Sequence, residues 1–152
     1  IIFWTMGSLS YVDMTDLAMV AICVAIGIFT VLFHARDLNA LLIDNQTAQS
    51  LGVNVERTKR IILLVCTLMV SAIVSCSGVI GFVGLVVPHA ARLLIGSDYR
   101  FLLPASALLG IAIVTLSDTF ARVIFAPIEL PVGIIMAFLG APFFLFLLRR
   151  EI

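Results

Sequence analysis

Residues 78–96 read Gly-Val-Ile-Gly-Phe-Val-Gly-Leu-Val-Val-Pro-His-Ala-Ala-Arg-Leu-Leu-Ile-Gly. The stretch is strongly apolar, yet Gly78, Gly81, Gly84 and Pro88 interrupt it. Glycines weaken a helix and permit close backbone approach, and proline cannot donate a backbone hydrogen bond. Broken helices are tolerated in membranes where protein or a cavity covers the backbone, and they are common in transporters. The stretch therefore predicts a membrane protein with a helix break, and possible gating, at these four residues.

The composition places the chain among integral membrane proteins. Of its 152 residues, 62% are hydrophobic and 12% are charged, whereas a soluble domain is about half apolar and about a quarter charged. The formal net charge is zero, which gives no bulk electrostatic reason to expect nucleic-acid binding. Cys23, Cys66 and Cys76 lie in apolar runs without a close pair, so we expect them to pack rather than to bind metal.

Charge-free apolar runs predict an all-α, polytopic membrane protein with about five spanning helices. A spanning helix needs roughly 17–25 mostly apolar residues. The run Ile61–Pro88 has 28 residues, so a break near its glycines divides it into two spans. The predicted spans are residues 15–34, 60–80, 83–96, 101–122 and 131–148. Residues 37–59, between the first two spans, form the longest polar stretch.

The positions of the basic residues support five spans. With that count, eight of the nine lysines and arginines fall on one side of the membrane. These eight are Arg36, Arg57, Lys59, Arg60, Arg92, Arg100, Arg149 and Arg150. Only Arg122 lies opposite, whereas the split would be five to four if residues 83–96 did not cross. Basic residues favour the cytoplasmic side, so we expect the N-terminal end outside and the C-terminal end inside, as in part of a longer protein.

The polar segment 37–59 is a candidate docking element for a cytoplasmic partner. Asp44 suits the N-cap of a short helix, and Gly52 suits the left-handed residue that follows its C-terminus. Ala48 and Leu51 are three residues apart and could present a small apolar patch. The alternative is a solvated loop that lies on the lipid surface, and periodicity alone leaves both interpretations open.

Three charged residues are predicted near the outer side. Asp118 and Arg122 have the spacing that allows an ion pair on one helix face, and unpaired charges at the bilayer centre cost at least about 2.5–3.5 kcal/mol each. The alternative for this pair is a role in the translocation path or in partner docking. Glu129 is the only acid of the outer loop before the last span, where it would either meet a basic residue of an extracellular partner or be solvated.

Motifs for catalysis or for an ATP site are missing from the sequence. Its one lysine, Lys59, follows Thr58, whereas a phosphate-binding GxxxxGK[ST] loop needs glycine directly before the lysine. No HExxH, GxSxG or CxxC motif occurs. We therefore expect no enzymatic activity, no cofactor and no metal site, and we expect a partner to supply energy. The alternative is an ion-coupled secondary transporter, which also uses broken helices.

Several segments, taken in order, resemble the FecCD family of permease subunits of ABC importers. These importers carry iron–siderophores, haem, cobalamin and related metal chelates. The segments are Leu38–Leu41, Ala48–Gly52, Gly78–Gly96, Leu103–Gly110, Ser117–Arg122, Glu129–Gly133 and Gly140–Phe144. The resemblance covers essentially the whole chain, and it implies the C-terminal half of a ten-helix type II ABC importer permease.

The resemblance also implies partners and a location. They are a second permease subunit, cytoplasmic ABC ATPase subunits, an extracellular or periplasmic substrate-binding protein, and the lipid of the bacterial inner or cytoplasmic membrane. Transport would proceed by alternating access at the permease dimer interface. Ala48, Leu51 and Gly52 fall in the short helices that dock into the ATPase in this family. The family often has Gly-Glu where this chain has Asp44-Asn45, which shifts the charge at that contact by one residue.

Overall fold

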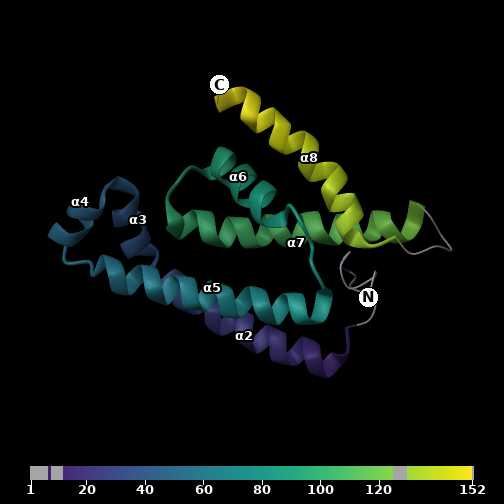
Figure 1. Cartoon of the computed structure of the whole chain (residues 1–152), viewed down its shortest axis with the longest axis horizontal. Coiled ribbons are helices and arrows are strands. Elements are labelled where there is room, and N and C mark those ends of the chain that lie inside the picture. Colours follow the sequence, from purple (N-terminus) through teal and green to yellow (C-terminus); the bar gives the residue numbers. More distant parts are fainter. Residues whose placement is uncertain (1–6, 8–11, 125–129, 152) are drawn as a thin grey trace.

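The computed structural model describes residue 7 and residues 12–124 and 130–151, and the regular secondary structure of these residues is entirely helical (Figure 1). The helices are α2 (Met14–Phe33), α3 (Ala35–Ile43), α4 (Asn45–Ser50), α5 (Val55–Ser77), α6 (Val83–Ile95), α7 (Tyr99–Ile124) and α8 (Val132–Glu151). The all-α prediction is confirmed. The largest difference from the predicted span boundaries is at the N-terminus of α5. This helix begins at Val55, whereas the predicted span begins at residue 60.

Three of the described helices are long and apolar enough to cross a membrane: α2, α5 and Tyr99–Val123 of α7. Only 6%, 6% and 11% of their most apolar windows are buried inside the structure, so most of this apolar surface is available to lipid or to neighbouring helices. The apolar helix α6 has 13 residues, which extend about 20 Å against a hydrocarbon core of about 30 Å. Five spans therefore stay a prediction, with α6 and the apolar part of α8 as the shorter members.

The helices pack as two layers (Figure 1). One layer consists of α2 and α5. The other consists of α6, α7 and α8, and α8 contacts both α6 and α7. The α2–α5 contact is close at Gly27, where an added Cβ would overlap the Met69 side chain. Small residues permit such approach in lipid, where packing drives helix association.

The two short helices α3 and α4 lie together at one end of the bundle (Figure 1). The start of α5 and the α6–α7 connection lie toward the same end. Six of the eight basic residues that were predicted on one side lie in these elements or within four residues of the α6–α7 connection: Arg36, Arg57, Lys59, Arg60, Arg92 and Arg100. The arrangement is consistent with the predicted cytoplasmic end.

Candidate coupling segment and helix break

The α3–α4 segment is a short helical hairpin, and α4 has a capping interaction at each end. The Asp44 side chain caps its N-terminus, since Oδ1 accepts a 2.7 Å hydrogen bond from the Asn45 N–H. At the C-terminus Gly52 has a φ of 84°. The Gly52 N–H donates to the Gln49 carbonyl at 2.9 Å and the Val53 N–H to the Ala48 carbonyl at 3.0 Å, which is the paired bonding of a Schellman motif. Both predicted capping roles are confirmed.

The prediction that Ala48 and Leu51 form one exposed apolar patch is wrong for Ala48. The Ala48 side chain is fully buried and packs with Ala40 of α3 and Val55 of α5. Leu51 is 68% exposed. The reason is that α4 ends at Ser50, so Leu51 leaves the helical face that the three-residue spacing assumed. Ala48 packs inside the hairpin, and Leu51 is exposed on its surface, as are Leu42 and Ile43 of α3.

Leu51 stands between two surface clefts, each of about 490 Å³. The cleft on one side is lined by Phe33, His34, Asp37, Leu51, Gly52, Val53, Asn54, Arg57, Thr58 and Ile61. The cleft on the other side is lined by Arg36, Asp37, Asn39, Ala40, Ile43, Leu51, Val53 and Arg100. A docking role for this exposed leucine stays a prediction.

Asn39 joins the hairpin to α7 through two hydrogen bonds. Its Nδ2 donates to Asp98 Oδ1 at 2.6 Å, and its Oδ1 accepts from the Tyr99 N–H at 2.8 Å. Asp98 also caps α7, because its Oδ1 accepts from the Arg100 N–H at 3.0 Å. The Arg100 N–H and the Asn39 amide hold the pKa of the Asp98 carboxyl below its ordinary value, and the Arg100 charge adds to this. Asp98 is therefore ionised at neutral pH.

The predicted helix break lies between α5 and α6. Gly78 is the C-cap of α5, with φ 71° and ψ −170°, a conformation that is essentially restricted to glycine. Ser77, the last residue of α5, is buried, and its Oγ donates to the Ile73 carbonyl at 3.0 Å. The chain enters α6 through Phe82, which is left-handed at φ 65° although it is not glycine.

Of the other three residues predicted at the break, Gly81 lies in the connection between α5 and α6, whereas Gly84 and Pro88 lie inside α6. Gly81 and Gly84 do not have a positive φ, and a Cβ on either would meet nothing within 4 Å. The close backbone approach expected at these two glycines is therefore wrong within the described chain. Pro88 lies inside α6, which continues through it from Val83 to Ile95. Proline only deprives the Gly84 carbonyl of its helical donor there.

An apolar cavity of about 470 Å³ opens beside the break. Its lining comes from α2, α5, α6 and α7 and includes Leu17, Val70, Ile73, Val83 and Val114. The break therefore borders space between the two helix layers. A gating role for it stays a prediction.

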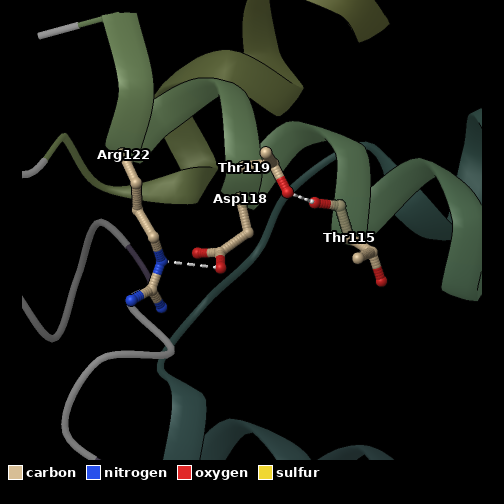
Figure 2. Close-up of polar contacts among 4 residues, drawn as sticks. All are labelled: Thr115, Asp118, Thr119 and Arg122. Carbon is tan, nitrogen blue, oxygen red and sulfur yellow. Dashed lines mark hydrogen bonds and ion pairs between the residues drawn. The ribbon is translucent and has the colours of Figure 1, made fainter.

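Asp118 and Arg122 form the predicted ion pair on α7 (Figure 2). Arg122 Nε donates to Asp118 Oδ2 at 2.8 Å, and the side chains are 46% and 22% exposed, respectively. Directly before Asp118, Ser117 is buried and donates to Met136 Sδ at 3.1 Å, which ties α7 to α8. The pair lies near the end of α7 remote from the α3–α4 hairpin. Glu129, the predicted docking residue for a binding protein, lies outside the described residues.

Comparison with known proteins places this architecture in a family. Residues 1–150 match the FecCD transport family. The chain belongs to that family. It is 48% identical over 151 residues to the cobalamin import system permease protein of Halobacterium salinarum, covering 99% of this chain and 40% of that protein. It is 43% identical over 148 residues to the hemin transport system permease protein of Yersinia pestis, covering 97% and 44%.

A solved structure gives the same fold for the FecCD chain. It is an ABC transporter assigned to the metal-chelate type, in an inward-facing conformation, with 32% identity and a TM-score of 0.91. The match covers 98% of this chain and 48% of that one. The FecCD chain thus spans less than half the length of these three proteins, and it is a multi-pass ABC permease segment by family and by fold.

The FecCD segment contains two features that the sequence interpretation missed. No local pattern pairs Asn39 with Asp98, which is 59 residues away. Asp98 itself has a recognisable signal, because an aspartate directly before an apolar helix is a common N-cap. The left-handed Phe82 has no such signal, since the nearby Gly81 and Gly84 are the residues that sequence alone would assign to that conformation.

Proposed function

We propose that the protein containing this chain is the permease subunit of an ATP-driven ABC importer for a metal chelate, working by alternating access. FecCD membership over residues 1–150 carries the proposal. The relatives named for cobalamin and hemin point to a metal held in an organic macrocycle, and a relative named for ferric dicitrate widens this to iron chelates. The substrate class common to them is a metal chelate.

ATP hydrolysis is assigned to a separate ABC ATPase that docks on the α3–α4 hairpin. Leu51 is the proposed contact, because it is a strongly exposed apolar residue that lines both clefts. Gly52 sets the direction in which Leu51 projects, and Ala48 supports both from inside the hairpin. The further proposed partners are a second permease subunit, an extracellular binding protein that Glu129 could contact, and membrane lipid.

The break between α5 and α6 is the proposed moving part. Gly78 ends one helix, the next begins five residues later, and an apolar cavity lies beside the joint. Hinges are a few loop or element-terminal residues that absorb the change in φ and ψ. A displacement of α6 relative to α5 at this joint would open or close a path between the helix layers.

Uptake by the full-length protein in vesicles tests the proposal. The full chain would be reconstituted with its ATPase, and uptake of cobalamin, hemin and ferric dicitrate would be followed with ATP on the ATPase side. We expect Leu51→Asp to lower ATP-dependent uptake at least about tenfold, because a buried unpaired carboxylate opposes docking. Leu42→Asp is the matched control, since Leu42 is an exposed leucine of α3 outside both clefts.

Two results would contradict the proposal. Full uptake by the Leu51→Asp protein would remove the docking site from the hairpin. Uptake that follows an imposed ion gradient and needs no ATP would instead support an ion-coupled secondary transporter.

A further inference from the structure

The link between the α3–α4 hairpin and α7 depends on one side chain. Among the hydrogen bonds of the described residues, the two made by Asn39 are those that join the hairpin to the α6–α7 half of the bundle. The other polar link of the hairpin, from Lys59 Nζ to Asn45 Oδ1 at 3.2 Å, stays between α4 and α5. The two links therefore differ, since the Asn39 bonds reach the layer of α7 and the Lys59–Asn45 bond reaches the layer of α5.

The Asn39 contact uses both ends of the amide. As a donor it meets an ionised carboxylate at 2.6 Å, and as an acceptor it takes the Tyr99 N–H, one of the donors that a helix N-terminus leaves without an intrahelical partner. Hydrogen bonds to charged groups are shorter and roughly twice as strong as neutral ones. Asn39 is only half-buried, so the bonds can break and re-form without leaving a deeply buried polar group unpaired.

The helix at the other end of this contact is the centre of its layer. α7 packs along α6, contacts α8 and also touches α3. The α6 helix begins just after the break at Gly78 and ends three residues before Asp98. A displacement at the N-terminus of α7 would therefore reach both the helix that follows the break and α8.

We infer that Asn39 is a positioning residue for energy coupling: its hydrogen bonds transmit a movement of the α3–α4 hairpin to α7. The inference rests on the proposed function, in which an ATPase moves that hairpin. Without the Asn39 amide, the ATPase would still bind and hydrolyse ATP, but the hairpin would move against α7 instead of carrying it along. Asn39 would then determine how much substrate is moved for each ATP, and not whether ATP is hydrolysed.

The test measures substrate transported per ATP hydrolysed by the full-length permease with its ATPase and binding protein in vesicles. We expect Asn39→Ala to lower this ratio about tenfold, because that is the size of effect that loss of one hydrogen bond to a charged group implies. Basal ATP hydrolysis should change less than about twofold. Asn45→Ala is the matched control, because it removes an exposed asparagine contact of the same hairpin that does not reach α7. Its ratio should equal that of the wild type.

A pair of exchanged residues separates coupling from folding. Asn39→Asp alone places two carboxylates against each other and should uncouple transport. The double variant Asn39→Asp with Asp98→Asn restores a donor and an acceptor across the contact, and its position 98 oxygen can still accept from the Arg100 N–H. We expect it to recover at least about half of the wild-type ratio.

Several outcomes would overturn the inference. They are an unchanged ratio in Asn39→Ala, an equal loss in Asn45→Ala, and a double variant that transports no more per ATP than Asn39→Asp. Should the wild-type protein itself show no ATP-dependent uptake, the proposed function fails and the inference fails with it. If the wild type and the Asn39→Ala protein transport the same amount of substrate per ATP, the inference is overturned and the proposed function stands.

Discussion

Phe82 lies directly against Gly140 of α8, so closely that a Cβ added at Gly140 would overlap the Cβ and ring of Phe82. Phe82 is the left-handed residue that starts α6 after the break. The position of α8 is thus tied to the conformation of the α5–α6 joint. Left-handed backbone costs a non-glycine residue roughly 1–2 kcal/mol. In this conformation the Phe82 side chain contacts Gly140 of α8.

Gly140→Ala is expected to destabilise the protein by about 1–3 kcal/mol, the usual cost of overpacking. The clash involves the Phe82 Cβ, which cannot move without its backbone. Unfolding of the purified full-length protein in detergent measures the change. Gly110→Ala is the matched control, because Gly110 is also helical and its Cβ would meet Val87 at an ordinary 3.7 Å. Equal stability of the two variants would contradict the Phe82–Gly140 contact.

The helix break should depend on Gly78 and not on Gly84. An alanine at Gly78 would have to adopt the glycine-only conformation at φ 71° and ψ −170°, which costs about 1–3 kcal/mol. Gly84→Ala replaces a helical glycine that has open space around it, and it should be neutral or stabilise by about 0.4–1 kcal/mol. Thermal unfolding of both variants gives the comparison. A loss of stability in Gly84→Ala that matched Gly78→Ala would place the break elsewhere.

Sequence reasoning succeeded where the deciding interactions are local. The long helices follow from the length of the apolar runs, and the ends of α4 follow from Asp44 and Gly52, whose side chain and backbone act on their immediate neighbours. The same holds for Asp118 and Arg122, which lie one helical turn apart.

It failed where the outcome depends on packing between distant segments. The spacing of Ala48 and Leu51 predicts a shared surface patch only for a helix that continues past Ser50, whereas α4 ends there and Ala48 is buried. Three evenly spaced glycines suggested three weak points, whereas only Gly78 adopts a glycine-only conformation and the left-handed residue near α6 is Phe82. These outcomes are set by α3, α5 and α8, which pack against the residues concerned.

Ala48 and Leu51 should separate stability from transport. Ala48→Leu inserts a large side chain into a fully buried site between α3 and α5 and should cost about 1–3 kcal/mol. Leu51→Ser alters an exposed residue and should change the free energy of unfolding by less than about 0.5 kcal/mol, while uptake falls. Unfolding in detergent and uptake in vesicles, measured on the same preparations, test both statements. An unstable Leu51→Ser protein would show that Leu51 is a packing residue.

The Asp118–Arg122 pair should contribute less than about 1 kcal/mol to stability, as exposed ion pairs do. Both side chains retain access to the surface, and the pair lies toward the end of α7. A double-mutant cycle with Asp118→Asn and Arg122→Gln isolates the interaction from other contacts of either residue. A coupling energy above about 2 kcal/mol would instead place the pair in the hydrocarbon region, where unpaired charges cost more.

The contribution of Asp98 should persist to acidic pH. Its pKa in the folded chain is below the ordinary value, first because of the Arg100 N–H and then because of the Asn39 amide. A lowered pKa adds stability at pH values above the unfolded pKa, roughly 3.9, and this stability is lost as the pH falls through the folded pKa. The stability difference between wild type and Asp98→Ala should therefore be constant from pH 8 to about pH 5 and narrow only below about pH 4. In an Asn39→Ala background the difference should be smaller above pH 5, and its loss should be complete at a higher pH, because one bond that lowers the folded pKa of Asp98 is gone while the Arg100 N–H remains. A difference that already narrows between pH 7 and pH 6 would show that Asp98 is not held as an ionised cap.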